Sequence, residues 1–435
     1  MAKKKDMVDK AVERLDQASL ANPLINALRD NDKKNLFKSN TVSCFHKTGF
    51  HLFDYYFGSV VNIHNEFGEI VSQEPRLGQA AGTFNVVVAK TGVGKTTFVV
   101  QIASNIMRQF PSSTIHHYDF EQRFSISRGQ AVSKLPISDF DENSGRYILK
   151  SGAISLEELQ EAIIQVYTYK MKNKNELSIN TKQLDEFGRE ITVLIPTIFI
   201  IDSISQVITS TFSVDNSKDV NDAKELRGNT EGARDAKTIR GFFKDILPLC
   251  KEANIIIYAI NHITTNMSMS AFAPPSKQQM FLKVDEAIPG GTAQFFNAFN
   301  FIKMVAKPND DFTEEKDGFN GYMVMFEPCK SSSNQSGNDS KGVSFEMVFS
   351  YKHGFDSLRS LIVYGRGKGI IEGNAPRLKF RDDPSFTFAF KEIDKEKDEK
   401  PIWDCIMKYI IPELKTHLSF IEPSDARFDD RSMNY

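Results

Sequence analysis

The sequence predicts an α/β fold in which a mostly parallel sheet is flanked by helices. Short apolar runs that suit buried strands recur along the chain, at 86–88, 114–118, 197–203 and 255–260. Segments with apolar residues at helical spacing lie between or after them, at 98–110, 156–169 and 231–252. This alternation is typical of strand–helix–strand units, whose strands pair in parallel.

The first of these units carries a loop with two glycines. Residues 83–98 read TFNVVVAKTGVGKTTF, so an apolar strand is followed by the glycines and by a helix that opens at Lys95 and Thr96. Glycines let successive backbone N–H groups converge on a phosphate, and the positive end of the helix dipole adds to the attraction. The pattern is G-x-x-x-x-G-K-[ST], except that Ala89 replaces the first glycine.

We therefore expect this glycine loop to bind a nucleotide together with Mg²⁺. Lys95 would hold the β- and γ-phosphates and Thr96 the metal. The other cofactor-binding positions are Ala89, Lys90, Thr91, Gly92, Val93, Gly94 and Thr97. A simple glycine turn beside a surface lysine is the alternative. The flanks disfavour it, because a buried strand precedes the loop and an amphipathic helix follows it.

Two further strands are followed by carboxylates. Glu121 comes after the strand at 114–118, and Asp202 closes the apolar run TIFIID. Ligands of open parallel sheets lie beyond the carboxyl ends of the strands, so both acids should face the same crevice as Lys95. Asp202 would support the metal, and Glu121 would orient or deprotonate the attacking water. The alternative for Glu121 is a solvated acid at a strand end.

Composition bounds the class of protein. The chain has 435 residues, 40% of them apolar, which suits one enlarged domain with small appendages. It lacks an apolar run that would span a bilayer and an apolar signal segment at its start, so we expect a soluble cytoplasmic protein without a membrane partner. The four cysteines lie far apart, which predicts neither a disulfide nor a zinc site. A net charge of −2 argues against a generally basic surface.

Several segments together resemble the UvsX-type phage recombinases of the RecA family. In chain order they are AKTGVGKTT at 89–97, DFE at 119–121, FIIDS at 199–203, AINH at 259–262, GGTAQFFNAFNFIKM at 290–304, FEPCK at 326–330 and HGFD at 353–356. The resemblance covers residues 45–375, most of the chain. It implies a RecA-like P-loop ATPase core at 45–378, with antiparallel strands added on the C-terminal side. A helical oligomerisation segment and linker at 1–44 and a C-terminal segment at 379–435 would flank this core.

The resemblance also implies an activity. It is that of a DNA-dependent ATPase which forms filaments on single-stranded DNA and catalyses homologous pairing and strand exchange in recombination and repair. The implied partners are single-stranded DNA, a homologous duplex, further copies of the chain, a loader or mediator and a single-strand-binding protein. If the chain is phage-encoded, it would act in the host cytoplasm.

Residues of the site carry over by position. Lys95, Thr96, Glu121 and Asp202 keep the roles given above, and His262 takes the place of a polar sensor of the γ-phosphate. Lys330 matches a catalytic cation that reaches the nucleotide of a neighbouring subunit. Family members usually carry a second cation two residues further on, whereas here serines follow Lys330. Arg123 and Arg128 are candidates for stacking on the base.

The segment at 263–289 would be the DNA-binding loop. Apolar side chains that wedge between bases are interleaved in it with cations that meet phosphates. With the two glycines that follow, the expected DNA-binding residues are Met267, Phe272, Lys277, Phe281, Lys283, Gly290 and Gly291. Another DNA loop is expected at 205–230, a polar stretch for which a disordered insertion is the alternative.

Two other functions share the same predicted core. A DnaB-type hexameric replicative helicase is one, but only about 80 residues precede the glycine loop, too few for the separate helical collar of such helicases. A RecA-like signalling or scaffolding ATPase that binds protein instead of DNA is the other.

The glycine loop yields a first prediction. Replacing Lys95 by alanine should abolish ATP hydrolysis, because it deletes the cation placed on the β- and γ-phosphates. Steady-state turnover of ATP by the purified variant measures this, and a variant with wild-type turnover would contradict the assignment.

Overall fold

The structure is a computed structural model that describes residues 44–152, 154–206, 231–265, 281–283, 286–289, 293–333 and 343–418. The chain separates into two compact units, 1–42 and 43–435, and all described residues belong to the second. The expected N-terminal segment therefore lies outside the described residues except for Cys44, and so does 207–230 of the expected DNA loop at 205–230.

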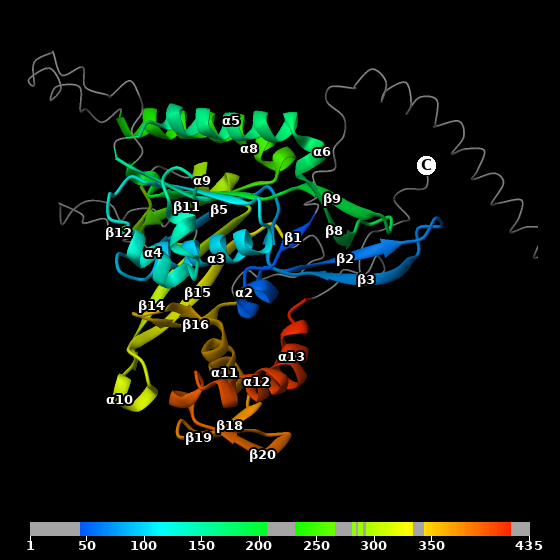
Figure 1. The fold of residues 1–435 in the computed structure, drawn as a ribbon, viewed down its shortest axis with the longest axis vertical. Helices are drawn as coiled ribbons and strands as arrows, with labels where there is room; N and C mark the ends of the chain where they lie inside the picture. Colours follow the sequence, from blue (N-terminus) through cyan, green and yellow to red (C-terminus); the bar gives the residue numbers. More distant parts are fainter. Residues whose placement is uncertain are drawn as a thin grey trace, which may run out of the picture. The chain divides into compact units, whose positions relative to one another are not determined.

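A large sheet of nine strands runs through the described residues (Figure 1). In spatial order its strands are β17 (Gly354–Asp356), β16 (Phe345–Ser350), β15 (Gly321–Ser331), β14 (Asn300–Phe312), β5 (Phe84–Ala89), β11 (Ile255–His262), β10 (Thr197–Asp202), β6 (Thr114–Asp119) and β7 (Tyr147–Ser151). From β14 to β7 every pairing is parallel, whereas β15, β16 and β17 extend the sheet antiparallel. The predicted mostly parallel α/β sheet is confirmed.

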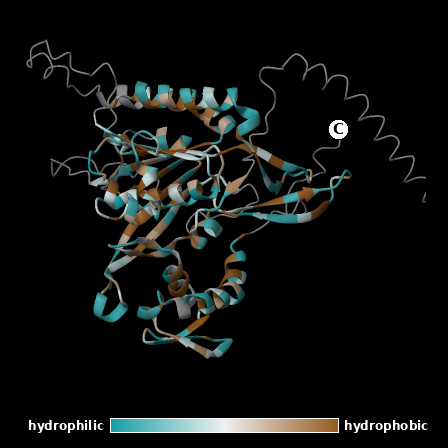
Figure 2. Cartoon of the chain, in the orientation of Figure 1, coloured by the Kyte–Doolittle hydropathy of each residue, from teal (hydrophilic) through white to brown (hydrophobic). Residues whose placement is uncertain are grey.

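Helices cover both faces of the parallel strands. Helix α3 (Lys95–Gln109) lies on one face, and α5 (Leu156–Lys172) and α8 (Glu231–Ala253) lie on the other (Figure 1). Along β5, Val87 packs into the cluster on the α3 side, and its neighbours pack into the cluster on the α5 and α8 side. Burial on both faces explains why these strands read as continuous apolar runs. Helix α5 is buried on one side only, and its residues are accordingly a mixture of hydrophobic and hydrophilic ones (Figure 2).

Two hairpins extend from the core, β2–β3 (Ser59–His64, Ile70–Arg76) and β8–β9 (Ser178–Leu184, Glu190–Leu194). Both close with the same turn sequence, an Asx residue followed by Glu-Phe-Gly. The tips are neighbours, because the backbone N–H of His64 donates to the carbonyl oxygen of Glu186 at 2.9 Å.

The two turns also share their geometry. In each, the Asx side-chain oxygen accepts two backbone N–H groups and the glycine adopts a positive φ, which costs glycine nothing. In the first turn, Oδ1 of Asn65 accepts from the N–H groups of Phe67 and Glu69, and Gly68 has φ +80°. In the second, Oδ1 of Asp185 accepts from the N–H groups of Phe187 and Arg189, and Gly188 has φ +74°. The phenylalanines at the tips are 79% and 71% exposed.

The C-terminal part of the described chain packs beneath the antiparallel strands. It comprises α11 (Ser357–Gly367), a small sheet of β18 (Ile371–Asn374), β19 (Arg377–Phe380) and β20 (Asp383–Phe388), and the helices α12 (Glu396–Cys405) and α13 (Ile411–Lys415) with a π-turn between them. The expected C-terminal segment from 379 thus shares a sheet with residues before it. Pro401 lies inside α12, which begins at Glu396. In the described residues no helix is long and apolar enough to cross a membrane.

A buried aspartate fixes the segment that leads into the core. Asp54 lies in α2 (His51–Tyr56), and its Oδ1 accepts bonds from the backbone N–H of Thr48 at 3.0 Å and from its hydroxyl at 2.5 Å. Burial raises the pKa of Asp54 to about 7, although the bonds from Thr48 and the charge of Lys47 act in the opposite direction.

This pKa predicts how stability depends on pH. An acid whose folded pKa is raised binds a proton more readily in the folded state, so its contribution to stability is lost as pH rises from about 4 to about 7. Between pH 5 and pH 7, wild type should lose about 2 kcal/mol relative to Asp54→Asn, since one pKa unit corresponds to about 1.4 kcal/mol. Urea unfolding of both proteins at the two pH values measures the difference, and parallel pH dependences would contradict the prediction.

Candidate functional site

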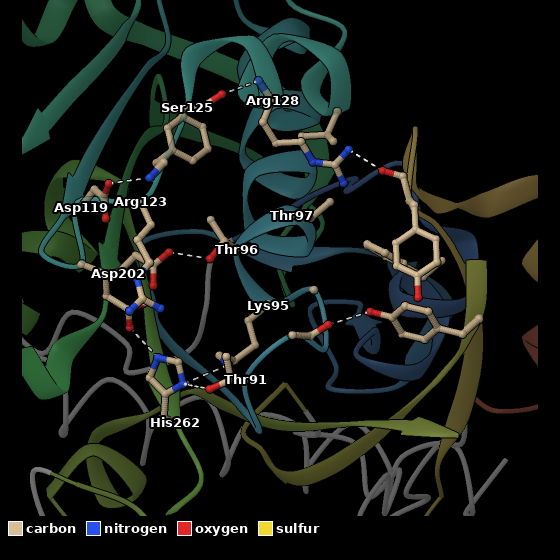
Figure 3. Close-up of a pocket in the computed structure, with 18 residues that line it drawn as sticks. Thr91, Lys95, Thr96, Thr97, Asp119, Arg123, Ser125, Arg128, Asp202 and His262 are labelled. Carbon is tan, nitrogen blue, oxygen red and sulfur yellow. Dashed lines mark hydrogen bonds and ion pairs between the residues drawn. The ribbon is translucent and has the colours of Figure 1, made fainter. Parts of the chain in front are cut away.

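A cleft of about 380 Å³ opens where β5, β6, β10 and β11 end (Figure 3). The pairing register aligns these ends: Asp202 pairs with Asp119, and His262 pairs with Ala89. The sequence-predicted residues Lys95, Thr96, Glu121, Asp202 and His262 all line this cleft. Four segments that are far apart in the chain therefore meet at one edge of the sheet, as a parallel sheet requires.

Lys95 is held over the glycine loop. Its Nζ donates to the carbonyl oxygens of Ala89 at 3.2 Å and Lys90 at 3.0 Å, and it lies 3.4 Å from Nδ1 of His262. Burial lowers the pKa of Lys95, while the charges of Asp202 and Glu121 oppose this shift. Gly94, the N-cap residue of the helix α3 behind it, lies in the left-handed region at φ +94°. A cation and a helix N-terminus thus face the same space, which suits an anionic ligand.

Thr96 and Asp202 form the oxygen pair that a metal would need. The Thr96 hydroxyl donates to Oδ2 of Asp202 at 2.5 Å (Figure 3). Burial raises the pKa of Asp202 to about 6, against the lowering effect of that hydrogen bond. A carboxylate and a hydroxyl are hard ligands of the kind Mg²⁺ prefers, and Mg²⁺ usually takes only one or two such ligands together with phosphate oxygens. The donor set therefore fits a phosphate-bound Mg²⁺.

Glu121 and His262 contact each other across the cleft. Nε2 of His262 and Oε1 of Glu121 are 2.5 Å apart, and Arg123 approaches the other carboxylate oxygen at 3.9 Å. Burial tends to raise the pKa of Glu121, but the hydrogen bond and charge of His262, with smaller contributions from Ser203 and Arg123, leave the pKa lowered. Glu121 is therefore present as a carboxylate at neutral pH, the form in which it accepts a proton or orients a water.

One wall of the cleft was not found from the sequence. It consists of the aromatic side chains Tyr322, Phe349 and Tyr351 from the antiparallel strands and the turn after them. Arg128 from α4 (Ile126–Ser133) reaches this wall and donates to the carbonyl oxygen of Tyr351 at 2.6 Å. Alternating aromatic residues on a strand predict packing, and no local pattern indicates that the strand borders a ligand cleft. Arg123 and Arg128, the candidates for base stacking, both line the cleft.

Lys330 lies elsewhere. Its Nζ donates to the carbonyl oxygens of Phe295 at 3.1 Å and Phe296 at 2.8 Å, in the short helix α9 (Ala293–Asn297), and it is not among the residues that line the cleft. Burial lowers the pKa of Lys330.

The expected DNA-binding loop is described only at its ends. Short strands β12 (Thr264–Thr265) and β13 (Glu286–Ala287) pair antiparallel and close its base, two residues after His262. Phe281 packs its ring against Phe295 and Phe301, at centroid distances of 5.1 and 4.7 Å. The side chain of Lys283 is exposed. The other expected DNA-binding residues, Met267, Phe272, Lys277, Gly290 and Gly291, lie outside the described residues.

Comparison with known proteins does not assign the chain to a family. No protein-family model matches the sequence, and a search of curated proteins finds no significant match. Within the described part of the chain, no group of three or more His, Cys, Asp or Glu residues is arranged to hold a metal.

The pair formed by Thr96 and Asp202 gives a prediction that separates metal binding from phosphate binding. Thr96→Val should weaken binding of a fluorescent ATP analogue by at least about tenfold with Mg²⁺ present and leave it nearly unchanged in EDTA, because only the metal needs the hydroxyl. Thr96→Ser retains the hydroxyl and is the matched control. Equal losses with and without Mg²⁺ would show that Thr96 acts on the loop and not on a metal.

Proposed function

We propose that this chain is a DNA-dependent ATPase of the RecA type, which assembles on single-stranded DNA and catalyses homologous pairing and strand exchange. The observation that carries the proposal is the cleft, where a lysine, a hydroxyl–carboxylate pair, a second carboxylate and a histidine come together from four strand ends. This is the set of groups that phosphoryl transfer to water requires.

Each group has one task in the proposed hydrolysis. Lys95 and the backbone N–H groups of the glycine loop bind the phosphates and offset the charge that develops on them. Thr96 and Asp202 would hold Mg²⁺, which neutralises phosphate charge when bound. Glu121 lies across the cleft as a carboxylate and orients the attacking water or takes its proton.

The coupling to DNA in this proposal depends on His262. It is the last residue of β11, it contacts Glu121, and the base of the expected DNA loop follows directly after it. A ligand that changes the placement of His262 therefore changes both the general base and the loop. Coupling of this kind is reciprocal, so DNA should favour the nucleotide-bound state as much as nucleotide favours DNA binding.

The deciding experiment combines turnover with electron microscopy. The full chain is incubated with ATP and Mg²⁺, with and without single-stranded DNA, and Lys95→Ala is the inactive control. We expect DNA to stimulate hydrolysis and helical filaments to form only with both DNA and nucleotide. Closed rings would favour the helicase, and assembly or hydrolysis independent of DNA would favour the signalling ATPase. All reactions are run at the same ionic strength, because the affinity of a protein for DNA depends on the salt concentration.

Glu121 provides a prediction specific to the chemical step. Glu121→Gln keeps the size of the side chain but cannot accept a proton, so turnover should fall about 100-fold or more while ATP still binds. Filaments on DNA should persist for longer than those of wild type, because hydrolysis no longer releases them. Parallel measurements of nucleotide affinity and turnover test this, and loss of nucleotide binding would show that Glu121 is structural.

A further inference from the structure

A tyrosine far away in the chain holds the glycine loop. Tyr322 lies on the antiparallel strand β15, and its hydroxyl donates to the carbonyl oxygen of Gly92 at 2.9 Å. The side chain is buried, and this burial raises the pKa of Tyr322 to about 12. The hydroxyl therefore stays protonated at neutral pH and remains a hydrogen-bond donor.

The position that a side chain of residue 92 would take is open. Gly92 has φ +84°, and a Cβ built on it would meet no heavy atom within 4 Å. Glycine in such open space has several backbone conformations of similar energy. The other loop glycine differs, because a Cβ on Gly94 would lie 3.0 Å from the ring of Phe349. The ring of Phe349 thus leaves little room for a side chain at Gly94, whereas Gly92 is contacted through its carbonyl by Tyr322.

The direction of one carbonyl sets the direction of one donor. A trans peptide unit is planar, and its C=O and N–H point in opposite directions. With the Gly92 carbonyl directed at Tyr322, the N–H of Val93 points away from the aromatic wall. Lys95 engages the carbonyl oxygens of Ala89 and Lys90. Three carbonyl oxygens of the loop are thus bonded to donors, which is the state in which a loop offers N–H groups to an anion.

We propose that Tyr322 is a positioning residue which presets the glycine loop for polyphosphate by fixing the Gly92–Val93 peptide. The inference rests on the proposed binding of nucleotide in the cleft and names the residue that sets its affinity. Without the hydroxyl, this peptide samples further orientations. The apparent affinity for polyphosphate then falls in proportion to the fraction of molecules in which the peptide keeps the binding orientation. The phosphate loop thereby becomes linked to the antiparallel part of the sheet.

Tyr322→Phe tests the hydroxyl while retaining the ring, which packs against Phe349 at a centroid distance of 4.9 Å. Direct titration with a fluorescent ADP analogue, and its competition by tripolyphosphate and by AMP, separates the subsites. We expect about five- to tenfold weaker binding of ADP and of tripolyphosphate, the effect of one net hydrogen bond, and a smaller change for AMP. The thermal unfolding midpoint should change by less than a few degrees.

Tyr167→Phe is the matched control. It removes a tyrosine hydroxyl that donates to Glu252 at 2.9 Å on the far side of the sheet, so nucleotide affinity should equal that of wild type. Equal affinities of Tyr322→Phe and wild type for all three ligands would overturn the inference. The inference would also be overturned if Tyr322→Phe lost affinity equally for AMP and for tripolyphosphate and had a lowered unfolding midpoint, because loss of a merely structural tyrosine has that effect.

The two proposals fail in different ways. If wild type binds neither the ADP analogue nor tripolyphosphate, the proposed nucleotide site itself is wrong, and the inference about Tyr322 falls with it. If wild type binds them and the two tyrosine variants do not differ, only the role of Tyr322 is wrong. Gly92→Ala is a second, independent perturbation of the same peptide. It should lower polyphosphate affinity because an L-residue is strained at the observed φ of +84°.

Discussion

The parallel pairing of β5, β11, β10 and β6 is the constraint on which the site depends. Hydrogen bonding in this register places the last residues of all four strands at one edge of the sheet. Neither a carboxylate nor a lysine is unusual by itself. Their convergence is set by backbone pairing, and burial of the strands on both faces makes a shift of that pairing costly. The chemistry of the cleft is thus a consequence of how the core packs.

Electrostatics within the cleft is balanced between a buried cation and several acids. Burial acts against the charged forms of both Lys95 and Asp202, yet each lies near groups of opposite charge or near hydrogen-bond partners. The short contact between Glu121 and His262 belongs to the same balance. In the proposed function, an anionic ligand with a divalent cation would change the charge around all of these groups, including His262 at the end of β11.

The antiparallel strands do more than enlarge the sheet. They carry the small C-terminal sheet and helices through a continuous hydrophobic cluster, and they supply the aromatic wall of the cleft. The hydroxyl of Tyr322 and the ring of Phe349 contact the two glycines of the loop from this wall. The glycine loop therefore borders β15 and β16 as well as its own strand and helix.

The sequence by itself determined the α/β class and the candidate residues Lys95, Thr96, Glu121 and Asp202, because apolar strands, amphipathic helices, the glycine loop and strand-end acids have local signatures. His262 became a candidate through the resemblance to a known family. The sequence missed the aromatic wall, and it could not place Lys330. Only the tertiary structure decided these, since contacts between residues hundreds of positions apart depend on strand order and register, which no local pattern encodes.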